Sequence, residues 1–156
     1  MSEQLETTST IEVQEKHQVD VFALQEFMED RVEGFSGNLT IREFSYGQSN
    51  PTYMLSTDRK RYVMRRKPPG QLLKSAHAVD REYRVISALR DTDVPVPKTY
   101  AICNDENVIG TCFYIMEYVQ GRVIADIVSG PYSNQDRAQV FDAANSVVAC
   151  LHNVDF

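Results

Sequence analysis

The sequence predicts an α+β fold in which five short strands form a twisted antiparallel sheet with a helix packed on one face. Two observations support this prediction. Five short, mostly apolar runs are bounded by turn residues, and a stretch with helical spacing separates the third run from the fourth. The chain has 156 residues, of which 42% are hydrophobic, so it is long enough for one domain with a core and too short for two.

The first element is a helix, expected over 21–32, that follows an acidic leader. Apolar residues recur in it at three- and four-residue steps, Asp20 can cap its first turn, and Gly34 ends it. The twenty residues before it carry five acidic side chains against one lysine and few large apolar side chains. We therefore expect 1–20 to be a disordered leader.

The five strands are expected at 39–44, 52–55, 62–65, 99–103 and 112–118. A second helix should lie between the third and fourth strands, because Ser75 is a suitable N-cap and a helical stripe runs from there to about Arg90. The apolar members of that stripe are Val79, Tyr83, Ile86 and Leu89. The fourth and fifth strands should be joined by a hairpin-type connection at 104–107.

After the last strand we expect a short helical piece at 123–128 and then a final helix. Ser133 and Asp136 have the spacing of a capping box, which would open this helix. Its apolar residues are expected to face inward: Val140, Phe141, Ala144, Val147, Val148 and Leu151.

Charge and composition exclude several classes of function. The formal net charge of −6 argues against a nucleic-acid partner, since a phosphate backbone needs a basic face. No apolar run approaches the roughly 20 residues of a membrane span, and the N-terminus has no export leader. We therefore expect a soluble, intracellular protein without a membrane partner. The three cysteines have no metal-site spacing and are expected to be reduced thiols.

Glu82 is the most informative charged residue. It lies three residues after Val79 and four before Ile86, so helical geometry turns its carboxylate toward the apolar stripe. A carboxylate facing a sheet needs a cation, and Arg65 at the end of the third strand is the natural partner. The alternative is that Glu82 lies at the edge of the stripe and is solvated.

The loop between the first two strands contains Ser45, Gly47, Gln48, Ser49 and Asn50, which are small or polar. Such residues let a backbone approach a ligand and present N–H groups to an anion. An ordinary hairpin turn is the alternative, because the loop lacks the motif of a known phosphate-binding loop.

A second ligand contact is expected where the fifth strand meets its linker, at Met116, Glu117 and Tyr118. This mostly apolar strand end could offer backbone groups to a flat heterocycle such as adenine. A strand end followed by a plain turn is the alternative.

Five segments that carry these features occur in one order: 44–53, 62–70, 75–84, 94–97 and 113–118. Together they resemble the aminoglycoside phosphotransferase and choline kinase family, which has a protein-kinase-like fold. The resemblance is strongest to the kinase-like domain at the N-terminus of acyl-CoA dehydrogenase family members ten and eleven, and it spans about 21–155.

The resemblance implies transfer of the γ-phosphoryl group of ATP, with magnesium, to a hydroxyl of a small molecule, which in the dehydrogenase branch is a hydroxyacyl-CoA. It implies that the loop covers the phosphates, that the arginine of the third strand contacts them, and that the end of the fifth strand lines the adenine pocket. The implied nucleotide-binding residues are Gly47, Gln48, Ser49, Arg65, Glu82, Met116, Glu117 and Tyr118.

The family's catalytic motif, similar to His-Gly-Asp-x-x-x-x-Asn, and its later metal-binding Asp are not found in these 156 residues. We therefore expect 21–118 to be a kinase-like small lobe and 119–156 to be a linker and the first helix of a truncated large lobe. No catalytic residue or metal ligand is assigned, and the chain should be inactive alone.

The other hypothesis is a non-catalytic binding or regulatory module whose apolar seam is covered by the missing lobe or by a partner chain. The compartment is unmarked in the sequence. Family likeness implies mitochondria or peroxisomes.

Overall fold

A computed structural model of the chain describes residues 9–45, 50–68, 78–121, 123–124, 126–128 and 130–155. Its strands are β1 (Thr10–Ile11), β2 (Thr40–Phe44), β3 (Thr52–Ser56), β4 (Arg61–Arg66), β5 (Thr99–Cys103) and β6 (Phe113–Glu117). Its helices are the 3-10 turn η1 (Glu15–His17) and the α-helices α1 (Val21–Arg31), α2 (Val79–Ala88), α3 (Glu106–Ile109) and α4 (Asn134–His152).

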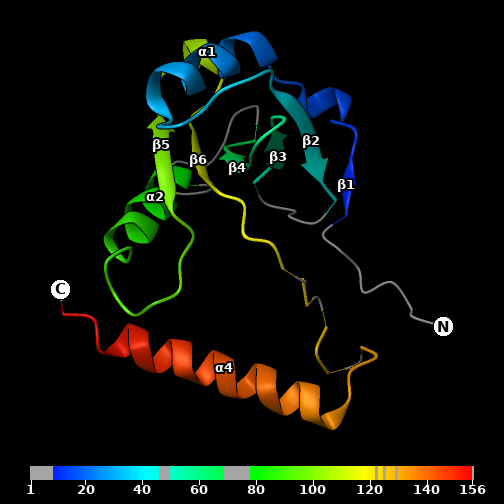
Figure 1. Cartoon of the computed structure of the whole chain (residues 1–156), viewed down its shortest axis with the longest axis vertical. Coiled ribbons are helices and arrows are strands. Elements are labelled where there is room, and N and C mark those ends of the chain that lie inside the picture. Colours follow the sequence, from blue (N-terminus) through cyan, green and yellow to red (C-terminus); the bar gives the residue numbers. More distant parts are fainter. Residues whose placement is uncertain are drawn as a thin grey trace.

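The strands form one antiparallel sheet in the order β1-β2-β3-β4-β6-β5 (Figure 1). The α+β prediction is confirmed, and each of the five expected strands is present with ends that shift by at most one residue. The chain leaves the sheet after β4, forms α2, and returns at the edge as β5. Strand β6 then fills the place between β4 and β5.

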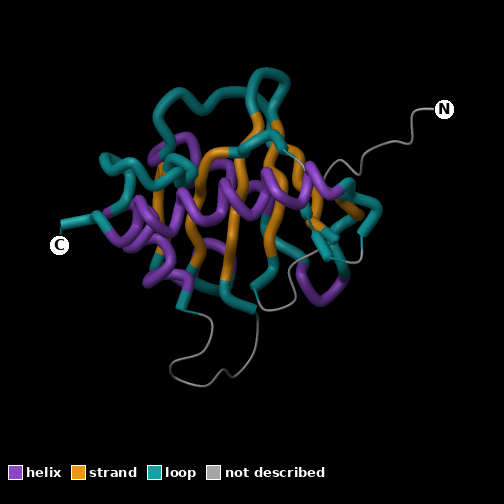
Figure 2. Tube along the Cα trace, turned by 90° about the horizontal axis from the view of Figure 1, so that it is seen from below, coloured by secondary structure: helices purple, strands orange, loops and turns teal. Residues whose placement is uncertain are grey.

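Alternation along β4 divides its side chains between two faces of the sheet. Tyr62 and Met64 belong to a large core cluster with α1, whereas Val63 and Arg65 point the other way, toward the side of α2. We call these the α1 face and the α2 face. In Figure 1, α1 lies above the sheet, and both α2 and α4 lie below it. Figure 2 shows α4 crossing the direction of the strands.

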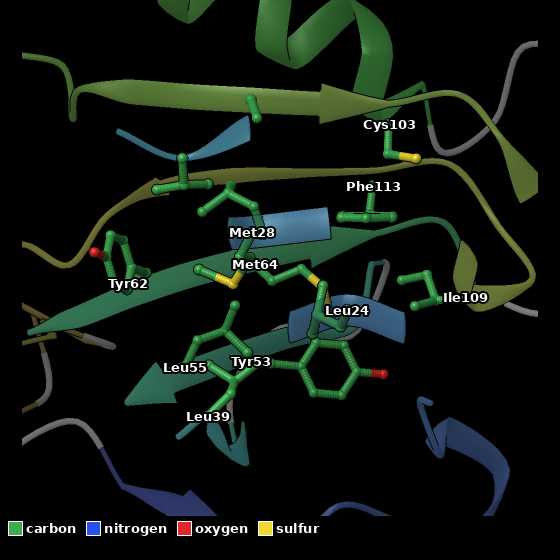
Figure 3. Packing of buried hydrophobic residues seen from close by; sticks show 13 residues of the cluster. Leu24, Met28, Leu39, Tyr53, Leu55, Tyr62, Met64, Cys103, Ile109 and Phe113 are labelled. Atoms are coloured by element: carbon green, nitrogen blue, oxygen red, sulfur yellow. The ribbon is translucent and has the colours of Figure 1, made fainter. Parts of the chain in front are cut away.

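The α1 face is a closed hydrophobic core (Figure 3). Leu24 and Met28 of α1 are fully buried against Met64 of β4, and Phe27 meets the ring of Phe113 edge-on at a centroid distance of 5.1 Å. Asp20 caps α1 as expected, since its Oδ1 accepts a hydrogen bond from the Ala23 N–H at 3.0 Å. The cap stabilises the first turn of α1, and the packing holds the helix against the sheet.

Among the described residues, those of α2 pack on the α2 face. A small cluster there joins Val79 of α2 to Cys112 and Tyr114, with Tyr83, Ile86, Ile102 and Met116 packed against it. The stripe predicted for α2 is therefore the face that packs on the sheet. The prediction of Ser75 as the N-cap of α2 is wrong: α2 begins at Val79, its N-cap is Ala78, and Ser75 itself lies outside the described residues.

The expectation of a disordered leader over 1–20 is wrong from Thr10 onward. Thr10 and Ile11 form β1, a sixth strand that pairs with β2, and η1 follows it. The leader is held by polar contacts: the Glu43 carboxylate accepts hydrogen bonds from the Gln14 N–H at 3.0 Å and lies 2.6 Å from His17 Nδ1. The acidic side chains of the leader led to the prediction of disorder, although it pairs with β2.

Two other expectations need correction. The connection between β5 and β6 is the short helix α3, capped by Asp105 and ended by Gly110, whose φ of 85° favours glycine. The helical piece expected at 123–128 is a turn at 127–128 among the residues described there. No helix in the described part of the chain is long and apolar enough to cross a membrane.

The capping box of α4 is confirmed, since Ser133 and Asp136 exchange side-chain and backbone hydrogen bonds. The prediction that the apolar stripe of this helix faces inward is wrong. Phe141, Val148 and Leu151 are 52%, 49% and 47% exposed, and no residue of α4 is buried. The reason is that none of the described elements packs over that stripe.

Candidate functional site

Arg65 and Glu82 form an ion pair on the α2 face, as predicted. The distance from Arg65 Nε to Glu82 Oε2 is 2.9 Å, and the two side chains are 32% and 35% exposed. The contact is ionic rather than an aligned hydrogen bond, because Nε has no partner at ordinary hydrogen-bond angles. The alternative of a solvated Glu82 is therefore wrong, and the pair remains accessible from one side.

Local structure explains why these two groups meet. Arg65 precedes the last residue of β4, and alternation turns it away from the α1 core. Glu82 lies one helical turn after Val79, which is fully buried against the sheet. The packing of Val79 therefore sets the height of the carboxylate over β4.

Two neutral donors also bind the Glu82 carboxylate. The Tyr114 hydroxyl donates to Oε2 at 3.2 Å, and the Asn50 amide donates to Oε1 at 3.2 Å. Tyr114 lies directly opposite Arg65 on the neighbouring strand β6, and both it and Asn50 are almost fully buried. The carboxylate thus has three partners from three parts of the chain.

Burial and charge keep the Tyr114 hydroxyl protonated. Its pKa is raised to about 12, mainly by desolvation and also by the charge of Glu82, whereas Arg65 acts in the opposite direction. The hydroxyl is consequently a hydrogen-bond donor to Glu82 across the physiological pH range.

Beyond the ion pair, the α2 face carries two further rows of side chains. Met54, Val63 and Met116 face one another across β3, β4 and β6 and form an apolar row. At the beginning of β4, the guanidinium of Arg61 lies over the ring of Tyr118 at 4.6 Å from its centroid. This apolar row therefore lies between two groups of polar and charged side chains.

The predicted residues at the end of β6 have different surroundings. Met116 is half-buried in the apolar row, and Tyr118 stacks with Arg61. Glu117 is exposed and bound to the segment before β5: its N–H donates to the Lys98 carbonyl at 2.8 Å, and its carboxylate accepts from the Lys98 N–H at 3.2 Å. The N–H of Glu117 is therefore already in use.

Gly47, Gln48 and Ser49 lie outside the described residues, so their predicted contact with phosphates stays a prediction. The bonds from Asn50 and Tyr114 to Glu82 were not predicted from the sequence. A signal existed for Tyr114, because alternation with the core residues Phe113 and Ile115 places it on the face of Arg65. Among the described residues, no group of three or more His, Cys, Asp or Glu side chains is placed to hold a metal ion.

An antiparallel sheet with a helix carboxylate paired to a strand cation on one face is the arrangement of the small lobe of kinase-like phosphotransferases, and Arg65 stands where protein kinases have a lysine. The sequence agrees with this class. The chain belongs to the phosphotransferase enzyme family, whose sequence model matches residues 40–156.

Relatives of the chain are described as acyl-CoA dehydrogenases. It is 44% identical over 151 residues to the IBR3 protein of Arabidopsis thaliana. This match covers 92% of this chain and 18% of that protein. It is 39% identical over 148 residues to acyl-CoA dehydrogenase family member 11 of Homo sapiens, which covers 92% of this chain and 19% of that protein. The chain thus spans about a fifth of the length of these relatives.

A solved structure is also similar. The crystal structure of a Ralstonia eutropha protein, described as an aminoglycoside phosphotransferase, is 48% identical and superimposes with a TM-score of 0.74. The similarity covers 88% of this chain and 39% of that protein.

Proposed function

We propose that residues 21–118 are the nucleotide-binding lobe of an ATP-dependent small-molecule phosphotransferase. Residues 119–156 would be the linker and first helix of its second lobe. The observation that supports this function most is the Arg65–Glu82 pair, with 2.9 Å between Nε and Oε2. A partly exposed guanidinium fixed by a carboxylate suits the binding of a phosphate group.

The order of rows on the α2 face suits a nucleotide. Residues two apart on a strand are about 6.6 Å apart, so the apolar row at Val63 lies about that distance from the row of Arg65. A purine stacked on Met54, Val63 and Met116 would have its phosphates near Arg65. The Arg61–Tyr118 pair would lie at the opposite end of the base.

Phosphoryl transfer itself would require residues beyond these 156. Magnesium would bind with the nucleotide, and the acceptor would be bound by the second lobe. The acyl-CoA dehydrogenase names of the relatives favour a hydroxyacyl-CoA acceptor, and hence mitochondria or peroxisomes as the site of action.

Isothermal titration of the 156-residue chain with ATP and magnesium tests the proposal. We expect saturable binding at one site, and a loss of at least about tenfold in affinity for Arg65→Met, because a charge-assisted contact to phosphate is removed. Arg81→Met is the matched control, since it removes the same charge from an exposed position on α2. Absence of ATP binding by the unaltered chain would contradict the nucleotide-binding function.

One observation favours a second candidate, a non-catalytic binding module. Large apolar side chains of α4 are exposed, among them Phe141, Val148 and Leu151, and such a surface suits association with another protein. Size-exclusion chromatography with light scattering separates the candidates when it is combined with the titration. A stable, monodisperse species that does not respond to nucleotide would favour the module.

A further inference from the structure

The Glu82 carboxylate is shared unequally between its partners. Oε1 accepts the amide of Asn50, while Oε2 receives both the Tyr114 hydroxyl and Arg65 Nε. A guanidinium usually engages a carboxylate through two parallel contacts, one to each oxygen. Here the Asn50 amide donates to Oε1, and the ion pair runs from Arg65 Nε to Oε2.

This arrangement leaves the end of the guanidinium available. Within the described residues, the Nη groups of Arg65 donate no hydrogen bond, and the side chain is 32% exposed. The bonds that would use an Nη group on Glu82 are replaced by bonds from neutral donors. The positive charge of Arg65 is thus positioned by Glu82 without being fully enclosed by it.

We propose that Asn50 and Tyr114 are positioning residues that hold Glu82 so that Arg65 turns its Nη groups toward the nucleotide phosphates. This inference rests on the proposed function. Asn50 directly precedes Pro51 and β3, so its bond also ties the start of β3 to α2. Affinity for the phosphates therefore depends on two residues that do not themselves contact the nucleotide.

The burial of both residues supports this role. Asn50 is 3% exposed and Tyr114 is 1% exposed, so each is fixed by its surroundings rather than by solvent. The raised pKa of Tyr114 keeps its hydroxyl protonated as a donor. If Asn50 is removed, Oε1 loses its amide donor and Arg65 can rotate to engage both oxygens, which withdraws the Nη groups from a ligand.

The test uses Asn50→Ala and Tyr114→Phe in the 156-residue chain, with Tyr83→Phe as the matched control. Tyr83 packs beside Tyr114, with ring centroids 5.8 Å apart, and donates no hydrogen bond to Glu82 in the described structure. Titrations are made with ATP and magnesium and, separately, with adenosine, which lacks phosphates.

We expect Asn50→Ala and Tyr114→Phe each to lose roughly tenfold in ATP affinity with adenosine affinity unchanged, and Tyr83→Phe to match the unaltered chain. Equal losses for ATP and adenosine would mean a structural role and overturn the inference, as would unchanged ATP affinity in both variants. If the unaltered chain binds no ATP, the proposed function fails, and this inference fails with it.

A measurement without ligand keeps the inference testable if a variant is poorly stable. The Nη rotation of Arg65, followed by NMR of the arginine side chains, should slow in Asn50→Ala as the guanidinium takes both carboxylate oxygens. Unchanged rotation in a folded variant would overturn the inference.

Discussion

Two neighbouring arginines of β4 show how the two faces of the sheet differ. Arg66 is 3% exposed on the α1 face, where its guanidinium lies over the ring of Tyr53 and donates to the Gln18 carbonyl at 3.4 Å. Arg65, on the α2 face, is about a third exposed and paired with Glu82. Adjacent residues of one type therefore have a structural role on one face and a candidate binding role on the other.

Two glutamates, Glu43 and Glu82, differ between the two faces in the same way as the arginines. Glu43 on the α1 face is 4% exposed, and its two oxygens bind Gln14 and His17 of the leader segment. Glu82 is bound by three groups and still leaves its arginine accessible. On the α1 face, the charged Glu43 binds the leader segment to the sheet. On the α2 face, the charged pair of Arg65 and Glu82 stays accessible to a ligand. Variants on the two faces should consequently separate stability from binding.

The largest loss of stability is expected from Phe113→Ala on the α1 face. Phe113 is fully buried and meets Phe27 edge-on, so truncation should leave a cavity and reduce the free energy of unfolding by about 3–5 kcal/mol. Urea denaturation followed by circular dichroism measures this. A loss below about 1 kcal/mol would show that the core is not packed as described.

The two arginines should differ in the same assay. Arg66→Met should lower the free energy of unfolding by about 2 kcal/mol, because a buried charged donor and its contact with Tyr53 are lost. Arg65→Met should change it by less than about 1 kcal/mol, since a partly exposed ion pair contributes little. If Arg65→Met were the more destabilising variant, the functional contrast between the faces would be wrong.

Alkaline pH should act on both faces through buried tyrosines. Burial raises the pKa of Tyr53 and of Tyr114 to about 12, above the ordinary value of 10.0. Burial also raises the pKa of Tyr62 and of the Cys103 and Cys112 thiols, whose ordinary values are 10.0 and 9.0. The folded state therefore holds protons that the unfolded state releases, so stability should begin to fall near pH 9 and continue to fall as the pH rises to about 12. Melting temperatures across this range, together with ultraviolet titration of the Tyr114→Phe variant, check it. Ionisation of all tyrosines near pH 10 in the folded chain would contradict it.

The smallest effect is expected at a helix end on the α1 face. Asp20→Ala removes the bond to the Ala23 N–H and should cost about 1 kcal/mol in the free energy of unfolding. Asp20→Asn should retain most of that stability, because the amide oxygen can still accept the bond. Equal destabilisation by both variants would show that charge rather than capping stabilises α1.

Most of the sheet could be predicted from local patterns, because alternation and turn residues are visible in single segments. The Arg65–Glu82 pair was predictable for a similar reason, since a helix position and a strand position each point toward the other. The predictions that failed concern segments whose contacts lie far away in the sequence. Residues 10–20 read as a solvated leader because Glu12 pairs with Arg42, and Gln14 and His17 bind Glu43, at positions far along the chain.

The bond from Asn50 to Glu82 could not be predicted, because its partner lies 32 residues away on α2. The stripe of α4 has helical spacing, and this spacing alone cannot tell whether another element covers it. Phe141 shows the consequence, with half of its surface exposed.

The methionine methyl groups offer the most direct test of which face binds the nucleotide. Met54 and Met116 lie on the α2 face, whereas Met28 and Met64 are fully buried in the core of the α1 face. NMR spectra of the methyl-labelled chain titrated with ATP and magnesium should show saturable shifts of Met54 and Met116 and little change at Met28 and Met64. Saturable shifts confined to Met28 and Met64, or none at any of the four, would contradict a nucleotide site on the α2 face.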